Sequence, residues 1–83
     1  MVITETSRAI LRRMYYFGFI GDMKHITFED LIVNFPNNVR GTARPRLEEL
    51  IEEENLILRH MTEHGEEYSI DSQSLDEIDE ILS

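Results

Sequence analysis

The first helix of the chain is predicted from the spacing of its apolar side chains. In residues 7–17 these side chains recur every three or four positions, which places them on one face of a helix. The positions are Ile10, Met14 and Phe17, with Leu11 beside them. Thr6 or Ser7 can cap the start of this helix, and Gly18 can end it.

A short extended piece and a second helix follow. Residues 24–26 form the extended piece. Thr27, with Asp30 three residues later, has the form of a capping box, in which a threonine hydroxyl accepts hydrogen bonds from amides of the first turn. The helix should run to about Phe35, because Pro36 and the two asparagines after it favour a turn over a continued helix.

The third helix is predicted between Thr42 and Glu54. Thr42 is its expected N-cap, and Pro45 then falls in the first turn, where a missing amide donor does no harm. The apolar positions of this helix are Leu47, Leu50 and Ile51. Asn55 should end it, because asparagine is one of the few non-glycine residues that tolerate the left-handed conformation found after helices.

The remainder of the chain predicts a β-hairpin and a last helix. Residues 56–61 and 68–70 are typical of two strands, and the polar segment 62–67, which contains Gly65, suits the hairpin tip. A second capping box begins at Ser74 and starts a helix with apolar residues along one face. These residues are Leu75, Ile78 and Leu82. The stripe either packs on its own domain or forms a dimer contact, since an exposed apolar stripe is unusual in a monomer.

In this order of elements the sequence resembles the winged helix-turn-helix family. The resemblance rests on Thr27 to Leu31 at the start of the second helix, on Leu47-x-x-Leu50 in the third, and on Asn55-Leu56-Ile57 at the entry to the hairpin. The family commonly has glycine at the position of Asn55, and asparagine meets the same backbone need. The likeness covers about residues 8–70.

The resemblance implies an α+β fold that is mainly helical. This is a winged helix with a three-helix core, a small antiparallel hairpin as the wing, and a short C-terminal helix. It implies one domain over residues 1–83, with the helix-turn-helix at about 27–54, the wing at about 56–71 and the last helix at about 74–82. A length of 83 residues and an apolar fraction of 41% agree with one modest core. The fold is used both for nucleic-acid binding and for protein interaction, so the fold alone does not determine the function.

The composition limits the other classes of protein. The chain has no cysteine, which excludes disulfides, thiolate zinc sites and a cysteine nucleophile. Its start has an early acid, Glu5, and lacks the pattern of a secretory signal, and its most apolar run, residues 14–20, is too short to span a bilayer. We therefore expect a cytoplasmic protein with no membrane contact, no cofactor and no enzymatic activity.

The charge is divided unevenly between two parts of the chain. The net charge is −9, but residues 1–46 carry 7 basic and 4 acidic side chains, whereas residues 47–83 carry 1 basic and 13 acidic ones. An average over the whole chain therefore hides a basic part of net charge +3.

Basic residues gather where the resemblance places the tip of the recognition helix. In a helix-turn-helix this tip meets base edges and phosphates in the major groove. The residues expected to bind DNA are Arg40, Thr42, Arg44 and Arg46. Bases at the start of a helix and acids at its end oppose the helix dipole, so a bound anion would stabilise this arrangement. The alternative is that Arg44 pairs with Glu48 one turn on and that the other arginines are solvated.

The hairpin supports DNA binding less well than the third helix does. Its carboxylates would repel phosphate unless the hairpin points away from DNA. They are Glu63, Glu66 and Glu67. The first helix has further arginines, Arg8, Arg12 and Arg13, which add contacts to DNA or, alternatively, form only a solvated face.

One catalytic motif is matched by the sequence but not by the predicted secondary structure. Residues 60–64 read His-Met-Thr-Glu-His, the spacing at which some metalloproteases hold zinc between two histidines of one helical turn. A strand and a turn are predicted here instead, and residues four apart on a strand are separated by about 13 Å. We therefore expect no zinc site at this motif. The remaining histidine, His25, belongs to the first short strand, whose usual partner in the family is the hairpin.

These features predict a winged-helix nucleic-acid-binding protein, specifically a small DNA-binding transcription regulator that works as a homodimer. Its expected partner is double-stranded DNA. The alternative is an interaction module without DNA binding, in which the acidic residues 48–54 and 63–67 dock a basic protein partner.

Overall fold

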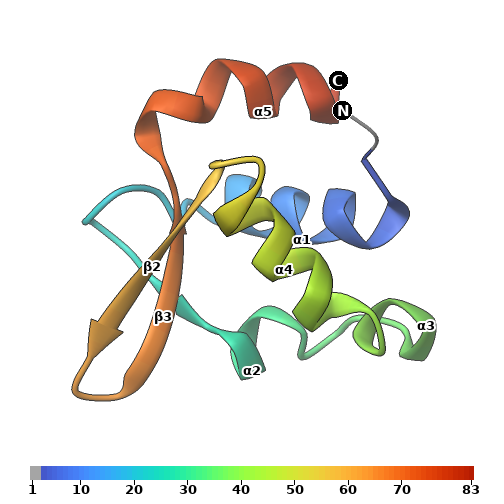
Figure 1. The fold of residues 1–83 in the computed structure, drawn as a ribbon, viewed down its shortest axis with the longest axis horizontal. Coiled ribbons are helices and arrows are strands. Elements are labelled where there is room, and N and C mark those ends of the chain that lie inside the picture. The colour runs from blue at the N-terminus through green and yellow to red at the C-terminus, as the bar shows by residue number, and fades with distance from the viewer. Residues whose placement is uncertain (1–2) are drawn as a thin grey trace.

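Helices surround a small sheet of short strands in the computed structural model, which describes residues 3–83 (Figure 1). The helices are α1 (Glu5–Tyr16), α2 (Phe28–Leu31), α3 (Asn37–Arg40), α4 (Ala43–Glu52) and α5 (Leu75–Leu82), with a 3₁₀ turn, η1, at Ser72–Ser74. The strands are β1 (Ile26–Thr27), β2 (Ile57–Thr62) and β3 (Gly65–Ile70). This α+β arrangement confirms the predicted fold class and is consistent with a winged helix. None of the helices in the described residues is long and apolar enough to cross a membrane.

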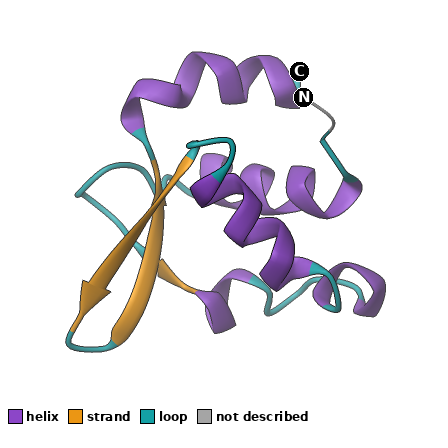
Figure 2. Cartoon of the chain, viewed as in Figure 1, coloured by secondary structure: helices purple, strands orange, loops and turns teal. Residues whose placement is uncertain are grey.

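Strand β3 lies in the middle of a three-stranded antiparallel sheet. The strand order is β1-β3-β2, and the hairpin pairs Ile57 with Ile70 at its base and Thr62 with Gly65 at its tip. Figure 2 shows the hairpin, in orange, projecting from one side of the helices. The predicted hairpin is confirmed with a tighter turn than expected, because Gly65 adopts φ +100° and lets the chain reverse within a few residues.

One hydrophobic core joins the longer elements. Its buried side chains come from α1, α4, the hairpin and α5, and include Ile10, Leu11, Met14, Leu47, Leu50, Ile57, Tyr68, Ile70 and Ile78. Helix α5 lies across α1, on the side away from α2 and α3 (Figure 1). In α5, Ile78 is fully buried, and Leu75 and Leu82 are partly buried against the same core. The apolar stripe of the last helix therefore packs on its own domain.

Helix α1 begins earlier than predicted. Its N-cap is Thr4, whose hydroxyl accepts a hydrogen bond from the amide of Ser7 at 3.1 Å. Thr6 and Ser7, which were expected to cap the helix, lie inside it and are buried. The predicted cap was wrong because the hydroxyl of Thr6 has another partner, the hydroxyl of Thr42 at 2.7 Å. This bond joins the start of α1 to the start of α4.

The second predicted helix is divided into two short helices. Its capping box is confirmed, because Thr27 accepts a hydrogen bond from the amide of Asp30 at 3.2 Å. Helix α2 then ends at Leu31, short of the predicted end near Phe35. Pro36 also opens α3, which the sequence did not predict. Its carbonyl accepts hydrogen bonds from two amides of α3, and a proline needs no amide of its own at a helix start.

Helix α4 follows the prediction closely at its start and at the turn after it. Thr42 precedes the helix, although it makes no capping hydrogen bond, and Pro45 lies in the first turn. The helix ends at Glu52, slightly before the predicted Glu54. Asn55 has φ +57°, which is the left-handed conformation predicted for it.

Replacing Asn55 by alanine should lower the free energy of unfolding by about 1 kcal/mol, because most residues with a Cβ are strained in the left-handed region. Asn55→Gly should keep or raise stability, since glycine adopts this conformation without a steric cost. Urea denaturation followed by circular dichroism measures both. Equal stability of the alanine and glycine variants would contradict the assigned backbone conformation.

The predicted capping box at Ser74 is wrong. Ser74 makes no capping hydrogen bond, and its hydroxyl donates instead to the carbonyl oxygen of Asn55 at 3.4 Å. Asp71 takes the capping role one turn earlier, where its carboxylate accepts from the amide of Gln73 at 3.0 Å. The 3₁₀ turn η1 therefore precedes α5, and the start of α5 is tied to the turn after α4.

Candidate nucleic-acid interface

Arg44 is the predicted site residue that its neighbours hold most firmly. It lies in the first turn of α4, and its guanidinium carbon is 3.9 Å from the centroid of the Phe28 ring. The same guanidinium donates a hydrogen bond to the hydroxyl of Tyr68 on β3, over 3.2 Å. A ring below and a hydroxyl beside it therefore fix the direction of a side chain that is otherwise exposed.

Arg40 and Thr42 differ in what they leave available to a ligand. Arg40 ends α3, is exposed, and forms no side-chain hydrogen bond or ion pair within residues 3–83. The hydroxyl of Thr42, by contrast, bonds Thr6 and lies 3.3 Å and 3.4 Å from the carbonyl oxygens of Val39 and Asn38. Arg40 can therefore meet a phosphate, whereas Thr42 holds α4 in place.

Arg46 lies on a different side of α4 from Arg44. Each residue turns an α-helix by about 100°, so residues two positions apart point in nearly opposite directions. Arg46 is half-buried and forms an ion pair with Glu49. The structure thus leaves Arg40 and Arg44 exposed around the turn into α4 and sets Arg46 apart from them.

The outward face of α4 is acidic. The core side of the helix carries Ala43, Leu47 and Leu50. Helical geometry therefore turns the opposite side chains away from the core. These are Pro45, Glu48, Glu49 and Glu52. DNA that lay along this face would meet carboxylates, and only the N-terminal end of α4 offers arginines.

Arg59 on β2 neutralises part of this acidic face. Its guanidinium forms ion pairs with Glu48, with Glu52 at 3.8 Å and with Glu66 at 3.0 Å. Two of these carboxylates belong to α4 and one to β3, so a single cation joins the hairpin to the helix. The alternative pairing of Arg44 with Glu48 is not observed, because Glu48 is engaged by Arg59.

Two of the three arginines on α1 join this helix to its neighbours. Arg8 donates a hydrogen bond to the carbonyl oxygen of Ile81 in α5. Arg13 donates to the carbonyl oxygen of Asp30 in α2 at 3.2 Å. Only Arg12 is an exposed arginine of the kind that a solvated helix face would show.

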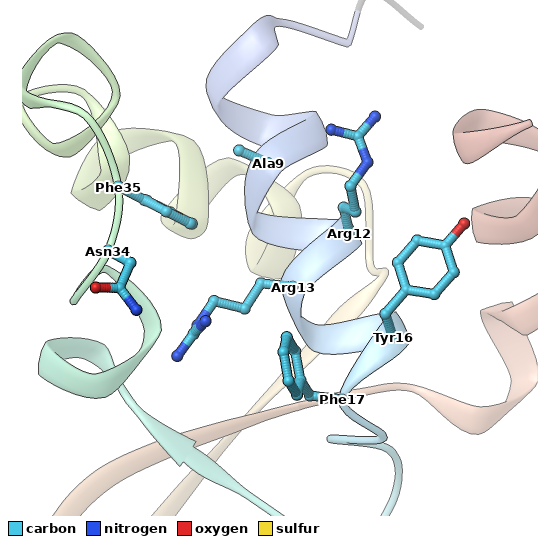
Figure 3. A pocket seen from close by; sticks show the side chains of 7 residues that line it. All are labelled: Ala9, Arg12, Arg13, Tyr16, Phe17, Asn34 and Phe35. Atoms are coloured by element: carbon cyan, nitrogen blue, oxygen red, sulfur yellow. The ribbon is translucent and has the colours of Figure 1, made fainter.

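A hollow of about 380 Å³ lies beside these arginines, between α1 and the connection from α2 to α3 (Figure 3). It combines guanidinium groups with aromatic rings, and its lining residues are Ala9, Arg12, Arg13, Tyr16, Phe17, Asn34 and Phe35. Figure 3 shows Arg13 reaching from α1 toward Asn34. The guanidinium carbon of Arg13 lies 5.2 Å from the centroid of the Phe17 ring. Part of the hollow is therefore spanned by a side chain with partners of its own.

Comparisons with known proteins leave the family open. Protein-family models, curated proteins and solved structures were compared with the chain, and none matches. The assignment of a function therefore rests on the geometry of the site.

Sequence reasoning identified Arg44 but missed the two side chains that position it. The sequence placed Phe28 in the second helix and Tyr68 in a strand, and it gave neither residue a part in the site. The hydrogen bond from Arg44 to Tyr68 joins positions 24 apart in the chain, which no local pattern reveals.

A second cluster of polar side chains lies on the sheet. The rings of His25, just before β1, and His60, in β2, stack in parallel with their centroids 3.8 Å apart. His64 lies in the hairpin turn, so the metalloprotease pattern lacks its helix, as predicted. Burial, and then the nearby His25, lower the pKa of His60 below its usual value, while Asp22 and Glu67 act in the opposite direction.

The stability of the protein should fall on acidification because of His60. Its pKa is lower in the folded state than the value of 6.5 for an unperturbed histidine, so the unfolded chain takes up the proton first. The free energy of unfolding should therefore be fully maintained above about pH 6.5 and decline as the pH falls through the lowered value. Urea denaturation in EDTA between about pH 7.5 and about pH 5 measures the decline. His60→Gln should flatten this part of the profile, and an equally steep decline in that variant would contradict the assignment.

Proposed function

We propose that the protein is a cytoplasmic winged-helix regulator that binds double-stranded DNA with the start of α4. The observation that supports this function is the pair of exposed arginines, Arg40 and Arg44, on either side of the turn into α4. Contacts with Phe28 and Tyr68 hold Arg44 in place, so less side-chain freedom is lost when it binds a phosphate or the edge of a guanine. The proposed role is binding, without catalysis.

The acidic outward face of α4 limits how DNA can lie on this surface. Contact is restricted to the N-terminal end of α4, because Glu48 and Glu52 lie farther along the helix. Each phosphate contact contributes about 0.9 to the slope of the logarithm of the binding constant against the logarithm of salt concentration. The two arginine contacts predict a slope of about −2, which is shallow for a DNA-binding protein.

A titration of isotopically labelled protein with duplex DNA at low salt tests this function. The amide signals of residues 40–47 should shift as DNA is added, while those at the hairpin tip, residues 63–67, should stay in place. Repeating the titration at several salt concentrations gives the slope. Unchanged signals at residues 40–47 with the duplex in excess would refute DNA binding by this surface.

A second candidate function is an interaction module that docks a basic protein. The specific observation in its favour is the run of carboxylates along the outward face of α4, which Arg59 only partly neutralises. Residues 47–83 together carry 13 acidic and 1 basic side chain. Complementary charge of this kind mainly raises the association rate and selects the partner.

The same labelled protein separates the two functions. A lysine-rich peptide should shift signals of Glu48, Glu49 and Glu52 if the acidic face is the docking surface. Shifts with the peptide and none with the duplex would favour the interaction module. Shifts at residues 40–47 with the duplex, and only weak ones with the peptide, would favour DNA binding.

A further inference from the structure

We infer that Asp22, His25 and His60 form a site for one divalent transition-metal ion of the zinc type, on the face of the sheet that points away from α4. One ligand atom from each of these residues lies within 4.8 Å of the ligand atoms of the other two. Asp22 belongs to the loop before β1, His25 directly precedes β1, and His60 lies in β2. The fold therefore assembles a cluster from three separate places in the chain.

Each of these two histidines has one ring nitrogen near a polar side chain of β3 and another that makes no hydrogen bond or ion pair with residues 3–83. His25 Nδ1 lies 3.6 Å from a carboxylate oxygen of Glu67, and His60 Nε2 lies 2.8 Å from the hydroxyl of Ser69. His25 Nε2 is buried and has no hydrogen-bond partner among residues 3–83. A buried nitrogen without a partner costs free energy that a bound ion would recover.

This pattern is the one that metal-binding histidines use. One ring nitrogen binds the ion, and a carboxylate or another polar group holds the second nitrogen, which fixes the tautomer and the orientation of the ring. Glu67 and Ser69, both on the central strand β3, occupy these supporting positions for His25 and His60. The supporting groups are therefore already in place on a rigid element.

Two imidazoles and one carboxylate suit zinc and its neighbours better than magnesium or calcium, which prefer oxygen ligands. Zinc–nitrogen distances of about 2.1 Å place tetrahedral ligand atoms about 3.4 Å apart. The ligand atoms of the three residues lie within 4.8 Å of one another, so each pair has to approach by no more than about 1.4 Å. Asp22 is exposed in a loop and can make this movement. In the stack, the ring planes are parallel, so the nitrogen lone pairs of the two histidines cannot both point at one ion. Metal binding therefore also requires one imidazole to rotate out of the stack. Water would complete the coordination.

The site lies on the opposite face of the sheet from the arginines. Side chains alternate between the two faces along a strand. Arg59 and its cross-strand partner Tyr68 point toward α4 and the core, so His60 and its partner Glu67 point the other way. A bound ion would cross-link the loop before β1 to the hairpin. The inference is therefore independent of the proposed DNA binding.

Titration of EDTA-treated and dialysed protein with Zn²⁺ tests the site. Calorimetry should show one ion per chain, and the ring-proton signals of His25 and His60 should shift while those of His64 do not. His25→Gln and His60→Gln should each weaken Zn²⁺ binding by more than about 100-fold, and Glu67→Gln by about 10–100-fold. Bound Zn²⁺ should also raise the melting temperature of the original protein and not that of the two histidine variants.

His64→Gln is the matched control, because it makes the same substitution in the hairpin outside the cluster and should leave the affinity unchanged. Circular dichroism in EDTA shows whether each variant is folded. Asp22→Asn provides a ligand variant in an exposed loop, where folding does not depend on the side chain, and it should weaken binding by about 10-fold or more. Retained affinity in the His25 and His60 variants, or the same signal shifts with Mg²⁺ alone, would overturn the inference in favour of scattered carboxylates. Equal losses in His64→Gln and His60→Gln would overturn it in favour of a site on the hairpin.

Discussion

Replacing Leu47 by alanine is expected to lower the free energy of unfolding by about 2–5 kcal/mol. Leu47 is fully buried, and it lies on the side of α4 that packs into the core shared with α1. The substitution removes apolar atoms from this core and leaves a cavity that its neighbours fill only in part. A domain of this length has a total stability of about 4–12 kcal/mol, so the loss is a large share of it. Urea denaturation at 25 °C measures the change.

Leu58→Ala is the matched control for this prediction. It removes the same atoms from β2, where the side chain is 38% exposed, and should cost less than about 1 kcal/mol. The difference between the two variants reports burial, since the chemistry of the substitution is identical. Similar losses at both positions would mean that α4 does not pack on α1 as described.

Removing Arg40 and Arg44 together should have the largest effect on DNA binding. A guanidinium that contacts DNA contributes about 1–3 kcal/mol, so the double alanine variant should lose at least about 10-fold in affinity at low salt. The salt slope should also become shallower by about 2, because two phosphate contacts are lost. Fluorescence anisotropy with a labelled duplex at several salt concentrations measures both quantities.

A second double variant distinguishes the effect of losing the two arginine contacts from the effect of changing the net charge. Arg12→Ala with Lys24→Ala removes two positive charges from other parts of the surface and should change DNA affinity by no more than about threefold. Melting temperatures of both variants show whether losing the contact of Arg44 with Phe28 disturbs the fold. Equal losses of affinity in the two double variants would show that binding follows charge alone and would remove Arg40 and Arg44 from the interface.

The features that the sequence predicted correctly depend on residues close together in the chain. The cap formed by Thr27 involves an amide three residues on, and the left-handed conformation of Asn55 is a property of one residue. The hairpin also follows from local signals, namely two short strands and Gly65 between them. Patterns of this range were sufficient to predict the fold class and the order of the elements other than α3 and η1.

Several of the features that were missed depend on contacts between distant residues, whereas α3 and the cap at Asp71 are local. The hydroxyl of Thr6 does not cap α1, because it bonds the hydroxyl of Thr42 instead. Thr42 lies 36 positions away in the sequence, so no local pattern reveals this contact. The contact of Arg44 with Tyr68 and the stack of His25 on His60 likewise join separate elements. A charge count located the basic tip, yet it could not show that Arg46 and Thr42 are engaged within the protein while Arg40 is exposed. Only the three-dimensional positions of the residues that bond these side chains show which of them are free to bind a ligand.

The strand order has a consequence for how copies of the protein behave at high concentration. Because β3 is central, β2 forms one border of the described sheet, and alternate residues of this six-residue strand present their backbone donors and acceptors on that side. Such a border is a template on which a second chain can add and start an aggregate. The net charge of −9 opposes that encounter by mutual repulsion, over a range of about 10 Å at 0.1 M salt. The acidity that would confine DNA to one end of α4 in the proposed function therefore also opposes self-association at an open sheet edge.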